Sequence, residues 1–244
     1  MKQIDIHISN ISKSFGRARA LSDVSIDFRR GNLYGVIGPA GAGKTTLFRI
    51  MLRLMRENIG TVEYRISNRP VDFEELREHI AYMPQSQSLY SDLSVSEHLD
   101  FFRQLYGIDA QQFAVRRDEL VHLARLDKFM DRPAGKLSGG MYKKLGLICA
   151  LLRSPEIILL DEPTNGVDPI SRREFWNLLN ASREQGILVI MSTAYMDEAE
   201  RCSDVVLMDG GRVLGAGEPV SLLRENGCDN FDQFFVRRGG ADNA

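Results

Sequence analysis

The stretch Gly38-Pro39-Ala40-Gly41-Ala42-Gly43-Lys44-Thr45 decides the fold of this chain. It fits the pattern G-x-x-x-x-G-K-[ST], in which glycines let the backbone approach an anion and successive N–H groups point at it. The apolar run 33–37 before it is typical of a buried strand, and apolar residues recur at helical spacing between Leu47 and Met55. The stretch is therefore predicted to be a phosphate loop at a strand-to-helix turn.

Two side chains of this phosphate loop have separate predicted roles. Lys44 would reach the β- and γ-phosphates of a nucleotide, and the Thr45 hydroxyl would hold Mg²⁺. The alternative is a glycine-rich turn that caps a helix and binds nothing, but the strand, the glycines, Lys44 and Thr45 in register favour the phosphate site. The residues predicted to contact the nucleotide here are Gly38, Pro39, Ala40, Gly41, Ala42, Gly43, Lys44, Thr45 and Thr46.

Composition and charge are those of an ordinary soluble globular protein. The 244 residues are 43% hydrophobic and 26% charged, enough for one large domain or a domain carrying a sub-domain. The net charge is −2 and the arginine pairs are scattered, so nucleic-acid binding gets no support. Cys149, Cys202 and Cys228 are odd in number and far apart, which predicts reduced thiols in a cytosolic setting and no disulfide-linked partner.

No membrane-directed segment is evident in the sequence. The N-terminus lacks a signal-peptide core, and the apolar run 145–152 is well short of the roughly 20 residues needed to cross a bilayer. We therefore expect any role at a membrane to come through a partner.

Alternating strands and then helices surround the phosphate loop. Runs 4–8 and 24–28 flank a turn at Gly16, and a third alternating run starts at Gly60, which predicts an antiparallel edge sheet. Phe15 beside that turn could offer an aromatic face to a purine, or belong to the core. A short helix is expected over 72–80 and a strand over 81–83. A helical pattern follows from Ser94 to about Arg132.

Leu137-Ser138-Gly139-Gly140 opens a further helix. Ser138 and the two glycines form a helix N-terminus able to bind an anion. A protein that binds one triphosphate at Lys44 has little use for a second γ-phosphate site in the same molecule, whereas two copies facing each other do. Alone, these four residues are a common capped helix start.

Two carboxylates, Asp161 and Glu162, follow the apolar strand 157–160, as expected of a central parallel strand beside the phosphate loop. Asp161 is placed to hold Mg²⁺, usually through water, and Glu162 to take the proton from the attacking water. Two acids after a strand are ordinarily a solvated strand end, but the phosphate loop in the same chain favours catalysis.

In this order, the motifs resemble the nucleotide-binding subunit of an ATP-binding cassette (ABC) transporter, whose signature is the segment 137–140. The resemblance covers roughly residues 4–219. It implies an α/β fold: a P-loop NTPase core of mainly parallel sheet, with an antiparallel β edge and a helical sub-domain. We expect the ABC ATPase domain over 1–220, its helical sub-domain over about 86–153, and a short C-terminal extension over 221–244 that resembles those of bacterial ABC-2-type multidrug exporters.

The resemblance also implies roles for residues outside the phosphate loop. Gln85 resembles the family's glutamine loop and would sense Mg²⁺ and the γ-phosphate, or be an ordinary polar loop residue. Asp168 caps the helix begun by Pro169, and in the family this loop lines the dimer seam and touches the opposite site. The predicted catalytic residues are Glu162, Gln85 and Lys44, the metal ligands Thr45, Gln85 and Asp161, and the additional nucleotide contacts Phe15, Ser138, Gly139, Gly140 and Asp168.

Position 194 departs from the family pattern. Segment 192–199 resembles the switch segment, in which a His normally follows Ser-Thr, contacts the γ-phosphate and orders the attacking water. This chain has Ala194, whose methyl group cannot donate a hydrogen bond, and its four histidines all lie earlier. We therefore expect a slow or asymmetric site.

The resemblance implies a function as well as a fold. It implies ATP and Mg²⁺ as cofactors, a second ABC ATPase subunit in a head-to-tail dimer, and an integral membrane permease that holds the chain on the cytoplasmic face of the membrane. The expected function is ATP hydrolysis that drives export. Two alternatives stay open: an ATP-gated dimerising clamp with little hydrolysis, and a soluble ABC ATPase without a transport role.

Overall fold

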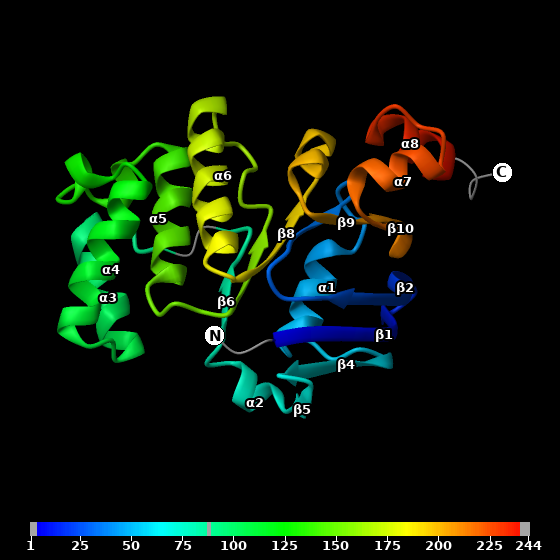
Figure 1. The fold of residues 1–244 in the computed structure, drawn as a ribbon, viewed down its shortest axis with the longest axis horizontal. Helices are drawn as coiled ribbons and strands as arrows, with labels where there is room; N and C mark the ends of the chain where they lie inside the picture. Colours follow the sequence, from blue (N-terminus) through cyan, green and yellow to red (C-terminus); the bar gives the residue numbers. More distant parts are fainter. Residues whose placement is uncertain (1–3, 87–88, 240–244) are drawn as a thin grey trace.

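The computed structural model describes residues 4–86 and 89–239, which form a mixture of strands and helices. The strands are β1 (Ile4–Phe15), β2 (Ala18–Phe28), β3 (Leu33–Ile37), β4 (Ile59–Ile66), β5 (Arg69–Val71), β6 (Ile80–Met83), β7 (Ile157–Asp161), β8 (Leu188–Thr193), β9 (Asp204–Asp209) and β10 (Arg212–Gly217). The α-helices are α1 (Lys44–Met51), α2 (Phe73–Leu76), α3 (Val95–Tyr106), α4 (Ala110–Leu123), α5 (Gly139–Leu151), α6 (Pro169–Glu184), α7 (Pro219–Glu225) and α8 (Phe231–Gly239), and the short 3-10 helices are η1 (Asp127–Phe129), η2 (Ala134–Lys136) and η3 (Met196–Arg201). Figure 1 shows α3 to α6 toward the left and α7 and α8 toward the upper right, and side chains from all of these helices belong to one buried apolar cluster.

The larger sheet carries the phosphate loop. Its order is β10-β9-β3-β8-β7-β6, in which β10 runs antiparallel to β9 and the other pairs are parallel. Strands β3, β7 and β8 are buried along their whole length, as their nearly continuous apolar runs require. Strand β8 separates β7 from β3, but their carboxyl ends share one edge, where Ile37 pairs with Thr193 and Asp161 with Ser192. This edge brings the phosphate loop and the carboxylates together.

The smaller sheet is the antiparallel edge that the alternating runs predict. Its order is β2-β1-β4-β5, and β1 pairs antiparallel with both β2 and β4. Gly16 makes the turn between β1 and β2 with φ 57°, a left-handed conformation that glycine adopts without strain. Apolar side chains of this sheet, of α1 and of one face of the larger sheet form a single buried cluster that includes Ile6 and Phe48.

Helices α3, α4 and α5 form the helical region. Ser94 and Glu97 make a capping box at the start of α3, and Gly107 ends this helix with φ 64°. Ser138 caps α5, since its hydroxyl accepts a hydrogen bond from the Met141 amide. The helix expected over 72–80 is only the four residues of α2, because the chain turns after it and enters β6.

A buried ion pair joins α5 to α6. The Lys144 side chain is 3% exposed, and its Nζ lies 2.6 Å from Glu174 Oε2 and donates to the Ala124 carbonyl oxygen at 2.6 Å. Arg125 reaches the same carboxylate at 3.1 Å with a side chain that is 72% exposed. Lys144 therefore contacts the Glu174 carboxylate from the protein interior, whereas Arg125 contacts it from the solvent-exposed surface.

Lys144→Met should lower the free energy of unfolding by about 3–5 kcal/mol, because Glu174 loses its buried partner. Arg125→Met is the matched control: it removes an exposed partner of the same carboxylate and should cost about 1 kcal/mol or less. Urea denaturation measures both values. Equal losses for the two variants would contradict the assignment of the buried pair as the stabilising one.

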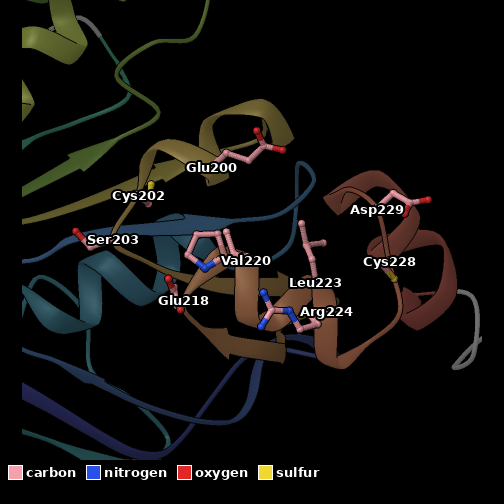
Figure 2. Close-up of a pocket in the computed structure, with 10 residues that line it drawn as sticks. Glu200, Cys202, Ser203, Glu218, Val220, Leu223, Arg224, Cys228 and Asp229 are labelled. Atoms are coloured by element: carbon pink, nitrogen blue, oxygen red, sulfur yellow. The ribbon is translucent and has the colours of Figure 1, made fainter.

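The C-terminal helices α7 and α8 pack against η3 and β10. A cavity of about 670 Å³ lies between them and the start of β9, with Cys202 and Ser203 on one wall and Leu223 and Cys228 on the other (Figure 2). Among the described residues, its lining contains none of the predicted site residues. The domain boundary at residue 220 falls within α7 and stays a prediction.

Candidate active site

The phosphate loop joins β3 to α1, and its backbone needs glycine at particular positions. Gly41 and Gly43 have φ of 83° and 98°, in the left-handed region that favours glycine. A Cβ at Gly43 would lie 2.6 Å from the Ala20 carbonyl oxygen, and one at Gly38 would clash with the Met208 carbonyl oxygen. The loop is thus packed closely against neighbouring backbone behind it, while a Cβ at Gly41 would meet only open space. A backbone cradle of this kind fits a phosphate chain.

Lys44 lies buried at the start of α1, with 4% of its surface exposed. Its Nζ donates hydrogen bonds to the Gly38 carbonyl oxygen at 2.7 Å and the Pro39 carbonyl oxygen at 2.9 Å, and lies 3.3 Å from Glu162 Oε1. The side chain therefore curls back over its own loop. This places a positive charge where the loop amides would receive an anion.

Asp161 ends β7 and is 1% exposed. Its Oδ1 accepts hydrogen bonds from Thr45 Oγ1 at 3.1 Å and from Ser192 Oγ at 2.6 Å. The Tyr82 hydroxyl lies 3.5 Å from Oδ2, and burial, with the Asp161 charge adding to it, raises the pKa of Tyr82 to about 12. A carboxylate beside a threonine hydroxyl is a donor set that suits Mg²⁺, which takes oxygen ligands and completes its shell with phosphates and water.

Glu162 follows Asp161 in a left-handed conformation with φ 47°. Such a conformation costs a non-glycine residue of the order of 1–3 kcal/mol and persists only where surrounding contacts enforce it. The Glu162 amide donates to Ser192 Oγ at 2.9 Å, and its carboxylate accepts from Gln85 Nε2 at 2.8 Å and from Asn165 Nδ2 at 3.4 Å. Together with Lys44, these contacts aim the carboxylate at the phosphate loop.

The structure places the predicted site residues in two groups. Lys44, Thr45, Gln85, Asp161 and Glu162 are linked by hydrogen bonds or an ion pair. The second group is the signature segment and the loop before α6. The signature segment packs closely against that loop. A Cβ added at Gly139 would lie 3.8 Å from the Gly166 carbonyl oxygen, and one added at Gly140 would lie 3.2 Å from Asp168 Oδ2.

The remaining predicted residues lie at the edges of these groups. Asp168 caps α6 by accepting from the amides of Ile170 and Ser171, and these hydrogen bonds hold the pKa of its carboxyl below the usual range. Phe15 is half exposed at the end of β1, and Lys13 Nζ lies 5.4 Å from the centre of its ring. Ala194 is exposed directly after β8.

Three residues that contact this site were missed in the sequence. Ser192 bonds both Asp161 and the Glu162 amide, Asn165 donates to Glu162, and Lys143 donates from α5 to the Gln85 carbonyl oxygen at 3.2 Å. Burial lowers the pKa of Lys143, and the carboxylates of Asp161 and Glu162 raise it in part. Ser192 is the next-to-last residue of β8 and begins the switch-like segment 192–199, which predicted no role for its hydroxyl. Lys143 lies near the start of α5, where no local pattern marks it.

Comparison with known proteins identifies the family. The family described as "ABC transporter" matches residues 21–165 of this chain. The chain belongs to the ABC transporter family. The resemblance drawn from the motifs is thereby confirmed.

Two relatives, one named for multidrug transport and one for Nod factor export, share this ABC sequence over most of its length. "Probable multidrug ABC transporter ATP-binding protein YbhF" of Escherichia coli (strain K12) is 41% identical over 206 residues, which are 84% of this chain and 36% of that protein. "Nod factor export ATP-binding protein I" of Ralstonia nicotianae is 33% identical over 226 residues, which are 92% of this chain and 70% of that protein. The chain thus spans about a third of the first relative.

Solved ABC structures have the same fold. A structure described as "ATP binding subunit of ABC transporter" aligns with a TM-score of 0.83 at 27% identity, over 96% of this chain and 99% of that one. The cbiO1 protein of Clostridium perfringens aligns with a TM-score of 0.79 at 26% identity, over 96% and 94%. These alignments confirm the predicted fold class. In the described parts of this ABC chain, no helix has the length and apolar character that crossing a membrane requires.

Proposed function

We propose that this chain binds and hydrolyses ATP as the nucleotide-binding subunit of an ABC exporter. One observation carries the proposal: the Glu162 carboxylate lies 3.3 Å from Lys44 Nζ and 2.8 Å from Gln85 Nε2 at the mouth of the phosphate loop. A base, a phosphate-binding cation and an amide are thus assembled within one chain. The proposed ATPase domain covers residues 1–220, with its helical sub-domain over about 86–153 and an extension over 221–244.

Each residue of this group has a proposed role in hydrolysis. Lys44 and the loop amides bind the β- and γ-phosphates. Thr45, Asp161 and Gln85 would hold Mg²⁺, which would neutralise charge on the phosphate oxygens. Glu162 accepts the proton of the attacking water on a carboxylate oxygen. Phe15 offers its ring to the purine.

The second group of site residues requires a second subunit. Among the described residues, no hydrogen bond or ion pair links Ser138, Gly139, Gly140 or Asp168 to the phosphate loop. Ser138 nevertheless caps α5, a helix whose N-terminus suits a γ-phosphate. A head-to-tail partner would place these residues on its neighbour's nucleotide. Hydrogen bonds to a charged phosphate contribute about 1.5–3 kcal/mol each. Several of them supply the roughly 5.5 kcal/mol that turns a mostly open dimer into a mostly closed one.

Export through a membrane partner is the wider proposal. Relatives are named for multidrug transport and Nod factor export, which supports an exporter and fits the ABC-2 type. The partner would be an integral membrane permease, and the chain would sit at the cytoplasmic face of the membrane through it. Co-purification with a membrane protein tests this and separates it from a soluble ABC ATPase.

An ATP-gated clamp with little hydrolysis is the second candidate, and Ala194 is the observation that favours it. The residue lies exposed after β8, near the point where Glu162 is bonded to Ser192, and it has no polar side-chain atom. A clamp of this kind would dimerise when ATP binds and would release the nucleotide slowly.

Ala194→His separates the two candidates. We expect this change to raise ATP turnover about 10- to 100-fold, because the ring adds a hydrogen bond to the γ-phosphate in the transition state. Ala194→Met, of similar size but without a donor, is the control and should leave turnover at the level of the unmodified protein. Steady-state phosphate release measures all three proteins. Absent hydrolysis in all of them, with ATP-dependent dimerisation intact, would establish the clamp instead.

A further inference from the structure

Lys143 connects the signature helix, which is α5 with the signature segment 137–140 at its start, to the Glu162 carboxylate of its own chain. It lies on α5, five residues after the Ser138 cap, and its Nζ donates to the Gln85 carbonyl oxygen at 3.2 Å. The Gln85 side chain in turn donates through Nε2 to Glu162 Oε2 at 2.8 Å. The contacts therefore run from α5 through Gln85 to Glu162, and from there to Lys44 at 3.3 Å.

The neighbouring lysine shows that this contact is not the helix's structural anchor. Lys144 is the residue that ties α5 to α6, through its buried pair with Glu174. Among the described residues, no carboxylate lies within ion-pair distance of Lys143, and its side chain donates to the Gln85 carbonyl oxygen. Lys143 is thus free to act on Gln85 without being needed to hold the helices together.

We propose that Lys143 is a positioning residue that transmits movement of the signature helix to Glu162 through Gln85. The inference deepens the proposed function and rests on it, because the signature helix is the element that would engage the neighbour's nucleotide. Movement of α5 shifts the Gln85 carbonyl oxygen, and the Gln85 amide then carries the shift to the carboxylate. Hydrolysis at one site thereby depends on the signature segment of the same chain being seated on the other.

Because position 194 is alanine, the contact of Lys143 with Gln85 matters for the orientation of Glu162. Ala194 supplies no side-chain donor, so the orientation of Glu162 depends on the partners that it has in the structure. These are Lys44, Gln85 and Asn165, and the Asn165 hydrogen bond is the longest at 3.4 Å. Gln85 is the one of the three that is also bonded to the signature helix.

Lys143→Met should lower kcat for ATP about 2- to 10-fold, the effect of losing one hydrogen bond that orients the base. KM for ATP and the melting temperature should stay unchanged, because Lys143 touches neither the nucleotide loop nor the α5–α6 pair. Lys143→Arg keeps a donor and should restore most of kcat. Lys128→Met, an exposed lysine of η1 in the same helical region, is the matched control and should leave kcat unchanged.

A double-mutant cycle with Gln85 tests the route of the coupling. If Lys143 acts through the Gln85 side chain, Lys143→Met should have no further effect on kcat in a Gln85→Ala background. Additive losses would overturn the proposal, and so would a lowered melting temperature that Lys143→Arg does not rescue.

Side-chain amide NMR tests the same link without requiring hydrolysis. The ¹⁵N–H signals of Gln85 Nε2, assigned by their loss in Gln85→Ala, should move in Lys143→Met in the same direction as in Glu162→Ala, which removes the acceptor, toward the position of a free glutamine amide. Unmoved signals would overturn the proposal even if kcat falls. Should the unmodified protein fail to hydrolyse ATP, the proposed function falls, and this spectrum still decides whether Lys143 positions Gln85.

Discussion

Glu162→Gln should lower ATP turnover at least about 100-fold, because an amide cannot accept the proton of the attacking water. The substitution is nearly isosteric, and the amide keeps an oxygen that can accept from Gln85 Nε2, whose present bond is 2.8 Å. Binding of ATP should therefore persist while its hydrolysis stops. Single-turnover measurement of phosphate release separates the chemical step from product release.

The control for this prediction is another partly buried carboxylate with one clear partner. Glu156 accepts from His79 at 2.9 Å, before the start of β7 and away from the phosphate loop. Glu156→Gln should leave turnover unchanged. Comparable rates for Glu162→Gln and the unmodified protein would show that Glu162 is not the base.

Lys44→Ala should weaken ATP binding about 100-fold, since charge-assisted hydrogen bonds to phosphate contribute about 1.5–3 kcal/mol each. The Lys44 ammonium is buried and already lies over the phosphate loop, so little reorganisation precedes binding. Because Lys44 is assigned to the β- and γ-phosphates, the affinity for AMP should fall much less than that for ATP. Isothermal titration with each nucleotide measures the difference.

Lys128→Ala serves as the charge-matched control here and should bind both nucleotides as the unmodified protein does. If Lys44→Ala weakened AMP and ATP binding equally, the lysine would be supporting the fold of the loop. Its assignment to the terminal phosphates would then be wrong.

The phosphate loop and the fold class were predictable because their signals are local. Gly41 and Gly43 occupy left-handed conformations that few other residues tolerate, and the apolar run of β3 and the spacing of α1 flank them. Asp161 and Glu162 could be proposed for the same reason, since carboxylates after a buried apolar strand stand out, and the structure places both beside the phosphate loop. In each case, neighbours in sequence carry the information.

The rest of the site depends on pairings between distant segments. No local pattern in the sequence indicates that β8 lies between β3 and β7 in the sheet. This strand order brings Ser192 to Asp161 and to the Glu162 amide. The contact of Lys143 with Gln85 joins residues 58 positions apart through the packing of α5 on the sheet. Helix α2 ended early for a similar reason, because pairing of β6 with β7 overrides the local helical pattern that follows Asp72.

The central claim is that a nucleoside triphosphate is held between the phosphate loop of one subunit and the signature segment of another. Light scattering on size-exclusion chromatography of Glu162→Gln with Mg-ATP tests it most directly. We predict a dimer with Mg-ATP, a monomer with Mg-ADP, and a monomer with Mg-ATP when Ser138→Arg is added to block the signature segment. A Glu162→Gln protein that binds Mg-ATP yet stays monomeric, alone and with its permease, would contradict the claim.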